Sequence, residues 1–289
     1  VVEMGMRGLG EIASLCQIAA PTLGVITNIG HTHQELLGTQ DNIALAKGEL
    51  LESLPADGWA VLNADDPWQV FLGQRCGVRA FYYGLQSATA DIYATDLRSE
   101  SNGSRFKVHL PQTAGEVWLP VPGQHNVTNA LAALGAGWLL GMQLEEMTEG
   151  LAKAQLSAMR LSINPGIEAT TIINDAYNAN PDSMLAALNV LSDTAGSRRI
   201  AVLGEMYELG DYAETGHRLV GTAAARLGVS CLLAVGKLAE HIAQGAREAG
   251  MPKALVATVP DNQQAIRLLE AYLQPGDVVL VKGSRGMHM

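Results

Sequence analysis

The sequence contains few cysteines, few aromatic residues and no long hydrophobic run. Its three cysteines, Cys16, Cys76 and Cys231, lie far apart and form no Cys-x-x-Cys pair, which argues against a disulfide framework and a structural zinc site. The longest apolar stretch, residues 130–142, contains several glycines and is shorter than the ~20 residues that a membrane-spanning helix needs. Because nothing resembles a signal peptide either, we expect a cytoplasmic protein without a membrane span.

Runs of like charge are also missing. The chain carries 29 acidic and 19 basic residues, a net charge of -10, so we expect no nucleic-acid partner. Its 289 residues are 48% hydrophobic and 17% charged, which provides ample core for two domains. We expect the protein to be a monomer.

Strands and helices alternate along most of the chain, which predicts an α/β fold of two domains. The first, residues 1–160, combines a mostly parallel central sheet with a small antiparallel meander over residues 89–119, where Asn102-Gly103 is a strong hairpin signal. The second, residues 161–289, is expected to be a Rossmann-like doubly wound unit, with a turn at Asn164-Pro165-Gly166 near its start. The strands are expected at 1–4, 23–28, 59–63, 78–83, 168–174, 199–204, 230–235, 254–258 and 277–282. The helices are expected at 9–19, 40–54, 66–75, 125–141, 144–153, 182–193, 213–227, 238–249 and 262–273.

The most informative segment is the polar turn that follows the expected strand ending at residue 174. Asp175, Tyr177, Asn178 and Asn180 offer a carboxylate, a phenol and two amides before Pro181 begins a helix. Polar groups at the carboxyl end of a strand in an α/β sheet usually meet a ligand. A capped strand-to-helix junction without a ligand is the alternative.

A second polar cluster follows the strand expected at residues 23–28. His31 and His33 lie in this loop, and Glu3 ends the neighbouring expected strand, so nitrogen and carboxylate donors could hold a divalent cation. Lys47 lies among apolar helical neighbours. The alternatives are a solvated loop and a lysine whose stem covers apolar surface while its charge reaches water.

A third cluster lies at the start of an alanine-rich helix. Asn126 and Asn129 are three residues apart and share a helix face, where their amides could read the edge of a purine. The alternative is that Asn126 or Thr128 is a simple helix cap.

Taken together, these clusters resemble the Mur ligase family, the ATP-dependent amide-forming enzymes of peptidoglycan synthesis. The resemblance covers essentially the whole chain and is closest to the members that join D-alanyl-D-alanine to UDP-N-acetylmuramoyl-tripeptide. Sister ligases tend to carry an Asp-Tyr-Ala-His type of string where this chain has Asp-Ala-Tyr-Asn. The distinguishing strings are Glu3-Met-Gly-x-x-Gly-x-Gly-Glu-Ile12, Ala46-Lys-Gly-Glu49, Asp175-x-Tyr-Asn-Ala-Asn180 and Val281-Lys-Gly-Ser-Arg285.

The resemblance implies that the cofactors are ATP and Mg²⁺. Glu3 and His33 would be magnesium ligands, and Lys47 would correspond to the family's carbamylated lysine, whose added carboxylate oxygens can also hold the metal. Asn126 and Asn129 would contact adenine.

The resemblance also implies roles for residues around the second domain. Arg160 would reach the phosphates, although this chain has Ala158-Met-Arg where the family commonly has Pro-Gly-Arg. Asp175 and Tyr177 would cover the nucleotide. The residues expected to be catalytic are His33, Lys47 and Arg160. The residues expected to bind substrate are Asn178, Asn180, Lys282, Ser284 and Arg285, of which the last three could equally form a basic surface turn.

A phosphate-binding Gly-x-x-x-x-Gly-Lys-Ser/Thr loop is missing from the 289 residues. In the family this loop precedes the position of Glu3, as does the domain that binds the uridine nucleotide. The chain begins in what looks like the middle of a strand and stops at Gly286-Met-His-Met289 without a closing helix, so we expect both ends to be truncated. A truncated N-terminus would explain the missing loop, and we expect that these residues alone do not turn over.

Four other functions are alternatives. A nicotinamide-dependent enzyme is disfavoured because Gly5, Gly8 and Gly10 do not follow the Gly-x-Gly-x-x-Gly spacing. A metal-dependent hydrolase could use His31 and His33. A non-catalytic binding module and a Mur-type ligase for a different amino acid or peptide are the remaining alternatives.

Overall fold

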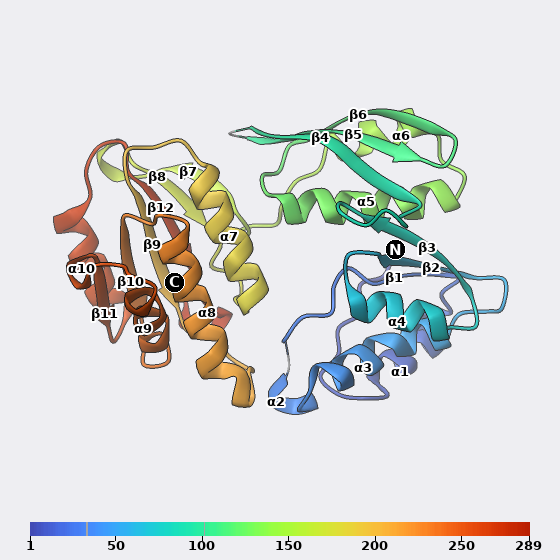
Figure 1. Cartoon of the computed structure of the whole chain (residues 1–289), viewed down its shortest axis with the longest axis horizontal. Helices are drawn as coiled ribbons and strands as arrows, with labels where there is room; N and C mark the ends of the chain where they lie inside the picture. The colour runs from blue at the N-terminus through green and yellow to red at the C-terminus, as the bar shows by residue number, and fades with distance from the viewer. Residues whose placement is uncertain (33, 101) are drawn as a thin grey trace. The chain divides into compact units, whose positions relative to one another are not determined.

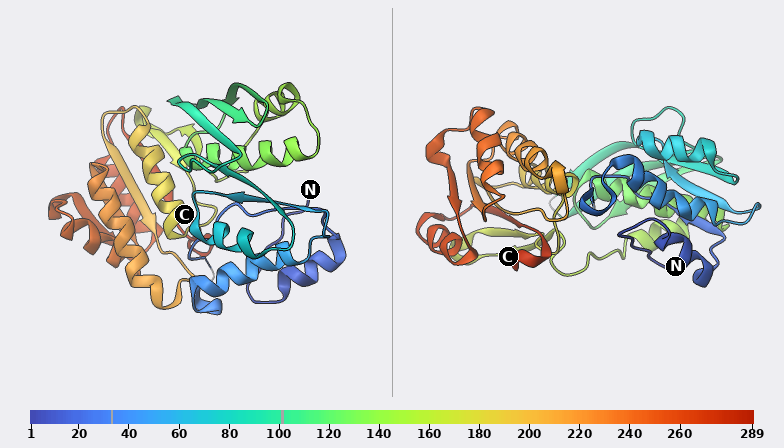
Figure 2. Two further views of the ribbon diagram at one scale, coloured as in Figure 1. Left: turned by 45° about the vertical axis from the view of Figure 1, so that its right-hand side comes forward. Right: turned by 90° about the horizontal axis from the view of Figure 1, so that it is seen from below.

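Two six-stranded sheets organise the chain, one in each of two units that span residues 1–155 and 156–289. The computed structural model describes residues 1–32, 34–100 and 102–289. Figures 1 and 2 show each sheet with helices packed along it. Both sheets are mostly parallel, which confirms the expected α/β class.

The sheet of the first unit keeps its strands in chain order. The first four strands run parallel to one another. The fourth strand also begins an antiparallel meander with the fifth and sixth strands, so the expected meander is confirmed. The strands are β1 (Leu23–Val25), β2 (Trp59–Asn63), β3 (Arg79–Gly84), β4 (Ile92–Glu100), β5 (Gly103–Leu110) and β6 (Thr113–Leu119). The helices are α1 (Glu11–Ala19), α2 (Gln34–Leu37), α3 (Gln40–Glu52), α4 (Pro67–Arg75), α5 (Gln124–Leu139) and α6 (Leu144–Leu151).

The helices of the first unit cover both faces of its parallel strands. Buried residues of α1, α3 and α4 pack with Ala60 and Leu62 of β2 on one face. Helix α5 packs on the other face, where a Cβ atom on Gly135 would lie 3.4 Å from side-chain carbons of Val61 and Phe81. Alternate residues of β2 therefore face opposite helix layers, as the pleat of a strand requires.

Two local predictions for the first unit were wrong. Residues 1–6 have no regular secondary structure, so the strand expected at 1–4 does not form. A strand needs a hydrogen-bonded neighbour, and residues 1–4 pair with no strand in the part of the chain that the structure describes. The short helix α2 was not predicted because four residues carry too little periodicity to recognise.

The second unit is an open sheet in the order β11-β10-β9-β12-β8-β7. All strand pairs are parallel except that of β7 with β8. Its strands are β7 (Ser162–Pro165), β8 (Thr171–Asn174), β9 (Arg199–Gly204), β10 (Cys231–Val235), β11 (Val256–Val259) and β12 (Val278–Lys282). Its helices are α7 (Pro181–Asp193), α8 (Ala213–Arg226), α9 (Glu240–Glu248) and α10 (Asn262–Tyr272). Short 3₁₀ turns lie at Ile167–Ala169, Gly210–Tyr212, Lys253–Leu255 and Arg285–Met287.

Strand β7 replaces the turn expected at residues 164–166. Asn164 and Pro165 pair with Ile172 and Thr171 of β8. A proline lacks the backbone N–H that an inner strand must donate, but it is tolerated in an edge strand. Edge strand β7 thus explains why a turn-like sequence is extended here.

The core of the second unit has two layers. Helices α7, α8 and α9 share a buried cluster with Ala201 and Leu203 of β9. Ile200 and Val202 of the same strand belong to a second cluster, which includes Ala265 of α10. None of the helices in the described residues combines the length and apolar character needed to cross a bilayer.

A fully buried histidine joins α8 to the loop after β9. The Nε2 atom of His217 accepts a hydrogen bond from the Met206 backbone N–H at 3.0 Å. Its Nδ1 atom lies 2.6 Å from the Ala213 carbonyl oxygen, to which it donates. The ring is therefore neutral, and burial lowers the pKa of His217 below its ordinary value.

This histidine predicts a pH dependence of stability. The unfolded chain binds the proton at a higher pH than the folded unit, so the free energy of unfolding should rise with pH up to about 6.5, by at most about 1.4 kcal/mol per pH unit. Below the lowered folded pKa this contribution levels off. Urea unfolding between about pH 5 and pH 7.5 measures this dependence. The free energy of unfolding should rise less steeply with pH in His217→Gln than in the native chain. His241→Gln is the matched control, and equal slopes for His217→Gln and the native chain would contradict the assignment.

Candidate active site

The best-defined polar cluster lies at the carboxyl ends of two neighbouring strands. β8 and β12 run parallel with Asn174 opposite Val281, so the residues that follow them emerge at the same edge of the sheet. The backbone N–H of Asp175 donates to the Val281 carbonyl oxygen at 2.9 Å, which extends the pairing by one step. Asp175 and Lys282 are thereby brought together.

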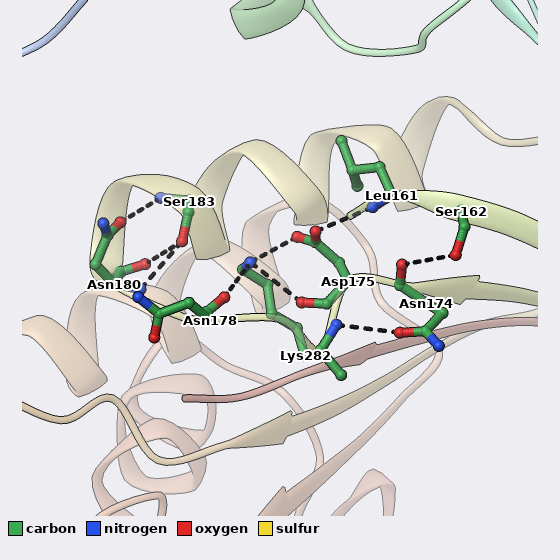
Figure 3. Close-up of polar contacts among 9 residues, drawn as sticks. Leu161, Ser162, Asn174, Asp175, Asn178, Asn180, Ser183 and Lys282 are labelled. Carbon is green, nitrogen blue, oxygen red and sulfur yellow. Dashed lines mark hydrogen bonds and ion pairs between the residues drawn. The ribbon is translucent and has the colours of Figure 1, made fainter. Parts of the chain in front are cut away.

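Lys282 forms a buried ion pair with Asp175. Its Nζ atom lies 2.6 Å from Asp175 Oδ2 and 2.9 Å from the Asn178 carbonyl oxygen (Figure 3). Lys282 is 2% exposed and Asp175 is 8% exposed. Burial lowers the pKa of Lys282 from its ordinary value, and the charge of Asp175 opposes that shift. The ion pair thus offsets much of the cost of burying an ammonium group.

The second carboxylate oxygen of Asp175 holds the segment around Arg160. Asp175 Oδ1 accepts from the Leu161 backbone N–H at 3.0 Å, and the Tyr177 N–H donates to the Met159 carbonyl oxygen at 3.0 Å. Met159 and Leu161 have φ angles of 62° and 44°, a left-handed conformation that is unfavourable for residues other than glycine. Both residues beside Arg160 are therefore held in a strained conformation by the turn after β8.

Two guanidinium groups lie close to the ring of Tyr177. The Cζ atoms of Arg160 and Arg285 lie 4.4 Å and 5.6 Å from the ring centroid. Both arginines are exposed, and within residues 1–32, 34–100 and 102–289 neither has a carboxylate at ion-pair distance. Stacked, unneutralised guanidinium groups are suited to binding a phosphate or a carboxylate.

Two of the residues predicted to bind substrate have structural contacts of their own. Asn180 is the N-cap of α7 and accepts from the Ser183 N–H at 2.8 Å, with Pro181 in the first turn. For Asn180 the capped junction is thus confirmed. Ser284 is buried, and its Oγ atom accepts from the Tyr207 N–H at 2.8 Å.

In the first unit, Lys47 reaches the loop that follows β1. Its Nζ atom donates to the Asn28 carbonyl oxygen at 2.6 Å. Tyr83 Oη donates to the Ile26 carbonyl oxygen at 2.9 Å, and Gln40 donates to that of Ile29 at the same distance. The loop is therefore held by side chains from β3 and α3, and Lys47 lies beside it. The prediction that this loop holds a divalent cation needs Lys47 in such a place.

The other predicted metal ligands are less well defined. Glu3 is exposed, and His33 lies outside the described residues. Nδ1 of His31 lies 3.1 Å from Gln34 Oε1. No group of three histidine, cysteine, aspartate or glutamate side chains that could hold a metal occurs among the residues described.

The predicted adenine ligands lie in the first two turns of α5. Asn126 is buried and its Nδ2 atom donates to the Pro122 carbonyl oxygen at 2.7 Å, whereas Asn129 is exposed. The N-cap of the helix is Gly123. The alternative that Asn126 or Thr128 caps the helix is therefore wrong.

Sequence reasoning missed the role of Glu49. Its two carboxylate oxygens accept from the backbone N–H groups of Gly10 at 2.5 Å and Ala13 at 3.0 Å. A carboxylate from α3 thus caps the N-terminus of α1, a position that favours negative charge. The only signal was its place in the string Ala46-Lys-Gly-Glu49, because the contact spans 39 residues.

Comparison with known proteins identifies the family. The profile "Mur ligase middle domain" matches residues 1–137, and "Mur ligase, glutamate ligase domain" matches residues 159–285. The chain belongs to the Mur ligase family, which confirms the resemblance seen in its sequence.

Two similar sequences and one similar structure illustrate the relationship. The UDP-N-acetylmuramoyl-tripeptide:D-alanyl-D-alanine ligase of Mycobacterium tuberculosis is 38% identical over 98% of this chain and 59% of its own length. The enzyme of the same name from Escherichia coli is 35% identical over 100% of this chain and 63% of its own length. The crystal structure of MurF from Acinetobacter baumannii superposes with a TM-score of 0.90 at 31% identity and covers 100% of this chain and 62% of that one. The chain thus spans about three fifths of the length of these relatives.

Proposed function

We propose that the protein containing this chain joins D-alanyl-D-alanine to UDP-N-acetylmuramoyl-tripeptide in an ATP-dependent reaction of peptidoglycan precursor synthesis. The observation that carries the proposal is the pair of exposed guanidinium groups, Arg160 and Arg285, beside the ring of Tyr177. Such a pair is suited to the anionic groups that this reaction brings together. The relatives that bear this activity in their names support the choice of substrates.

The reaction places charge where these residues could stabilise it. The carboxylate of the tripeptide attacks the γ-phosphorus of ATP, the bond to the bridging oxygen breaks, and an acyl phosphate and ADP form. The amine of D-alanyl-D-alanine then attacks the acyl carbon, loses a proton and expels phosphate. Arg160 would stabilise the charge on the transferring phosphoryl group.

Four of the predicted residues are proposed to bind the nucleotide. Asn126 and Asn129 are proposed to read the adenine edge through their amides. Asn129 is exposed, and the Asn126 amide donates one of its protons to the Pro122 carbonyl oxygen. Asp175 and Tyr177 are likewise proposed to contact the nucleotide.

Glu3, His33 and Lys47 are proposed to hold a hard cation such as Mg²⁺. Glu3 offers an exposed carboxylate, and the Lys47 Nζ atom lies against the loop that leads to His33. A carbamate on Lys47 would add two oxygen donors of the type that magnesium prefers. Bound there, the ion would neutralise negative charge on the phosphates.

The dipeptide carboxylate is proposed to bind Arg285. This side chain is exposed at the carboxyl end of β12, and a guanidinium can bind a carboxylate through two parallel hydrogen bonds. Asn178 lies in the neighbouring turn, where its side-chain amide could contribute to the same substrate.

An assay of the intact protein tests the proposed function. Purified protein, ATP and Mg²⁺ are incubated with a panel of UDP-muramyl peptides and with D-alanyl-D-alanine, D-alanine or no amine. We expect ADP and the ligated product only with a tripeptide acceptor and the dipeptide. Ligation of a single amino acid would identify a different Mur-type ligase, and hydrolysis without ATP would favour the metal-dependent hydrolase.

A further inference from the structure

The ammonium group of Lys282 is fully engaged within the second unit. It has three acceptors, which are Asp175 Oδ2 at 2.6 Å, the Asn178 carbonyl oxygen at 2.9 Å and the Asp175 carbonyl oxygen at 3.4 Å. An ammonium group has three protons to donate, and this side chain is 3% exposed. Lys282 thus has neither a spare donor nor an accessible surface for a substrate.

The contacts of Lys282 lead directly to Arg160. The Asp175 carboxylate, which pairs with Lys282, also accepts a hydrogen bond from the Leu161 N–H. Two residues further on, the Tyr177 N–H donates to the Met159 carbonyl oxygen. These two hydrogen bonds hold the residues on each side of Arg160, both in the left-handed conformation. Such strain persists only where surrounding contacts enforce it.

We propose that Lys282 is a positioning residue: it fixes Asp175, which in turn fixes the strained segment 159–161 and so places the Arg160 guanidinium over Tyr177. The catalytic consequence rests on the proposed function, in which Arg160 stabilises the transferring phosphoryl group. The placement of Arg160 itself does not depend on that function. Figure 3 shows the chain of contacts from Lys282 through Asp175 to Leu161.

Trypsin cleavage after Arg160 measures this placement without reference to activity. A protease needs a locally extended, mobile segment, so cleavage reports on local opening. In the intact protein, Lys282→Met should increase the rate of cleavage between Arg160 and Leu161 by about tenfold or more. Lys253→Met is the matched control because Lys253 is an exposed lysine of the same unit. Equal cleavage in Lys282→Met and the native protein would overturn the proposal.

A second variant separates loss of positioning from failure to fold. Lys282→Met leaves Asp175 as a buried carboxylate without its partner, which can destabilise the whole unit. The double variant Asp175→Asn with Lys282→Met removes that uncompensated charge and also lacks the ion pair. It should therefore show faster cleavage after Arg160, while cleavage after Arg226 at the end of α8 stays at the native rate. Native rates at both sites would overturn the proposal.

Steady-state kinetics then distinguish positioning from substrate contact. If Lys282 acts through Arg160, Lys282→Met should lower the kcat of the native protein by at least about tenfold. In a protein that already carries Arg160→Lys, the same change should lower kcat by less than about twofold, because the positioned guanidinium is already gone. The KM for D-alanyl-D-alanine should change by less than about twofold. A raised KM for the dipeptide with an unchanged kcat would assign Lys282 to the substrate instead. If the protein proves not to be this ligase, the cleavage rates still decide whether Lys282 positions Arg160.

Discussion

Replacing Lys47 with alanine is expected to lower the rate of ligation by about a thousandfold or more. The Nζ atom of Lys47 lies 2.6 Å from a carbonyl oxygen of the loop after β1, where a carbamate could help to hold Mg²⁺. Without it the metal loses oxygen donors, and short carboxylic acids such as acetate may be tested for partial rescue because they supply similar oxygens. Initial rates of ADP release by the intact protein give the measurement.

Two comparisons show whether the carbamate or the positive charge matters. Lys47→Arg keeps a cation that can donate to the Asn28 carbonyl oxygen but cannot form the carbamate, so it should be as inactive as Lys47→Ala. Lys153→Ala changes an exposed lysine of the same unit and should leave the rate unchanged. An active Lys47→Arg variant would show that Lys47 acts as a structural cation.

Replacing Arg198 with methionine is expected to destabilise the second unit by about 3–5 kcal/mol at pH 7. Arg198 donates to both carboxylate oxygens of Asp277, at 2.8 Å and 2.5 Å, and Asp277 is 1% exposed. The variant leaves this carboxylate buried, and among the described residues the Gln274 N–H is then its one remaining hydrogen-bond donor. Urea unfolding followed by far-ultraviolet circular dichroism measures the loss. Tryptophan fluorescence would not report on the second unit, because all four tryptophans belong to the first unit. They are Trp59, Trp68, Trp118 and Trp138.

The destabilisation should depend on pH in a defined direction. The hydrogen bonds from Arg198 lower the pKa of Asp277 below its ordinary value, so the stability they contribute is present above about pH 4 and is lost as the pH falls further. In Arg198→Met the pKa of the buried Asp277 carboxyl should rise. The difference in free energy of unfolding between the variant and the native protein should therefore become smaller below about pH 5. Arg218→Met breaks the exposed pairs with Glu214 and Glu248 and should cost at most about 1 kcal/mol. Equal losses for the two variants would contradict the prediction.

The sequence was sufficient to predict the fold because its periodicity reflects burial on both faces of two sheets. β2 and β9 have the bounds that alternating turns and apolar runs predicted. The strand expected at residues 1–4 and the turn that became β7 were wrong for a common reason. Whether an extended segment becomes a strand depends on a neighbour to pair with, and a single sequence does not specify that neighbour.

The candidate site could be predicted in position but not in detail. Strand ends in a parallel sheet meet at one edge, so Asp175 and Lys282 were both expected there, but their contact depends on β8 and β12 being neighbours, which the order of elements does not specify. What each side chain binds was not predictable, because the Lys282 contacts span more than one hundred residues and depend on side-chain orientation. The left-handed residues beside Arg160 were equally hidden, since neither is a glycine or an asparagine.

Three consecutive residues in the string Ala46-Lys-Gly-Glu49 of α3 contact three different parts of the first unit. Lys47 contacts the loop after β1, Glu49 contacts the start of α1, and a Cβ atom on Gly48 would lie 3.0 Å from Leu72 of α4. Successive residues of a helix point about 100° apart, so three neighbours in sequence meet three separate parts of the unit. A shift of α3 toward any one of them pulls it away from the others. The rigidity of this corner is therefore a property of one helix turn, and adjusting the loop after β1 by evolution or design requires compensating changes on α1 and α4 as well.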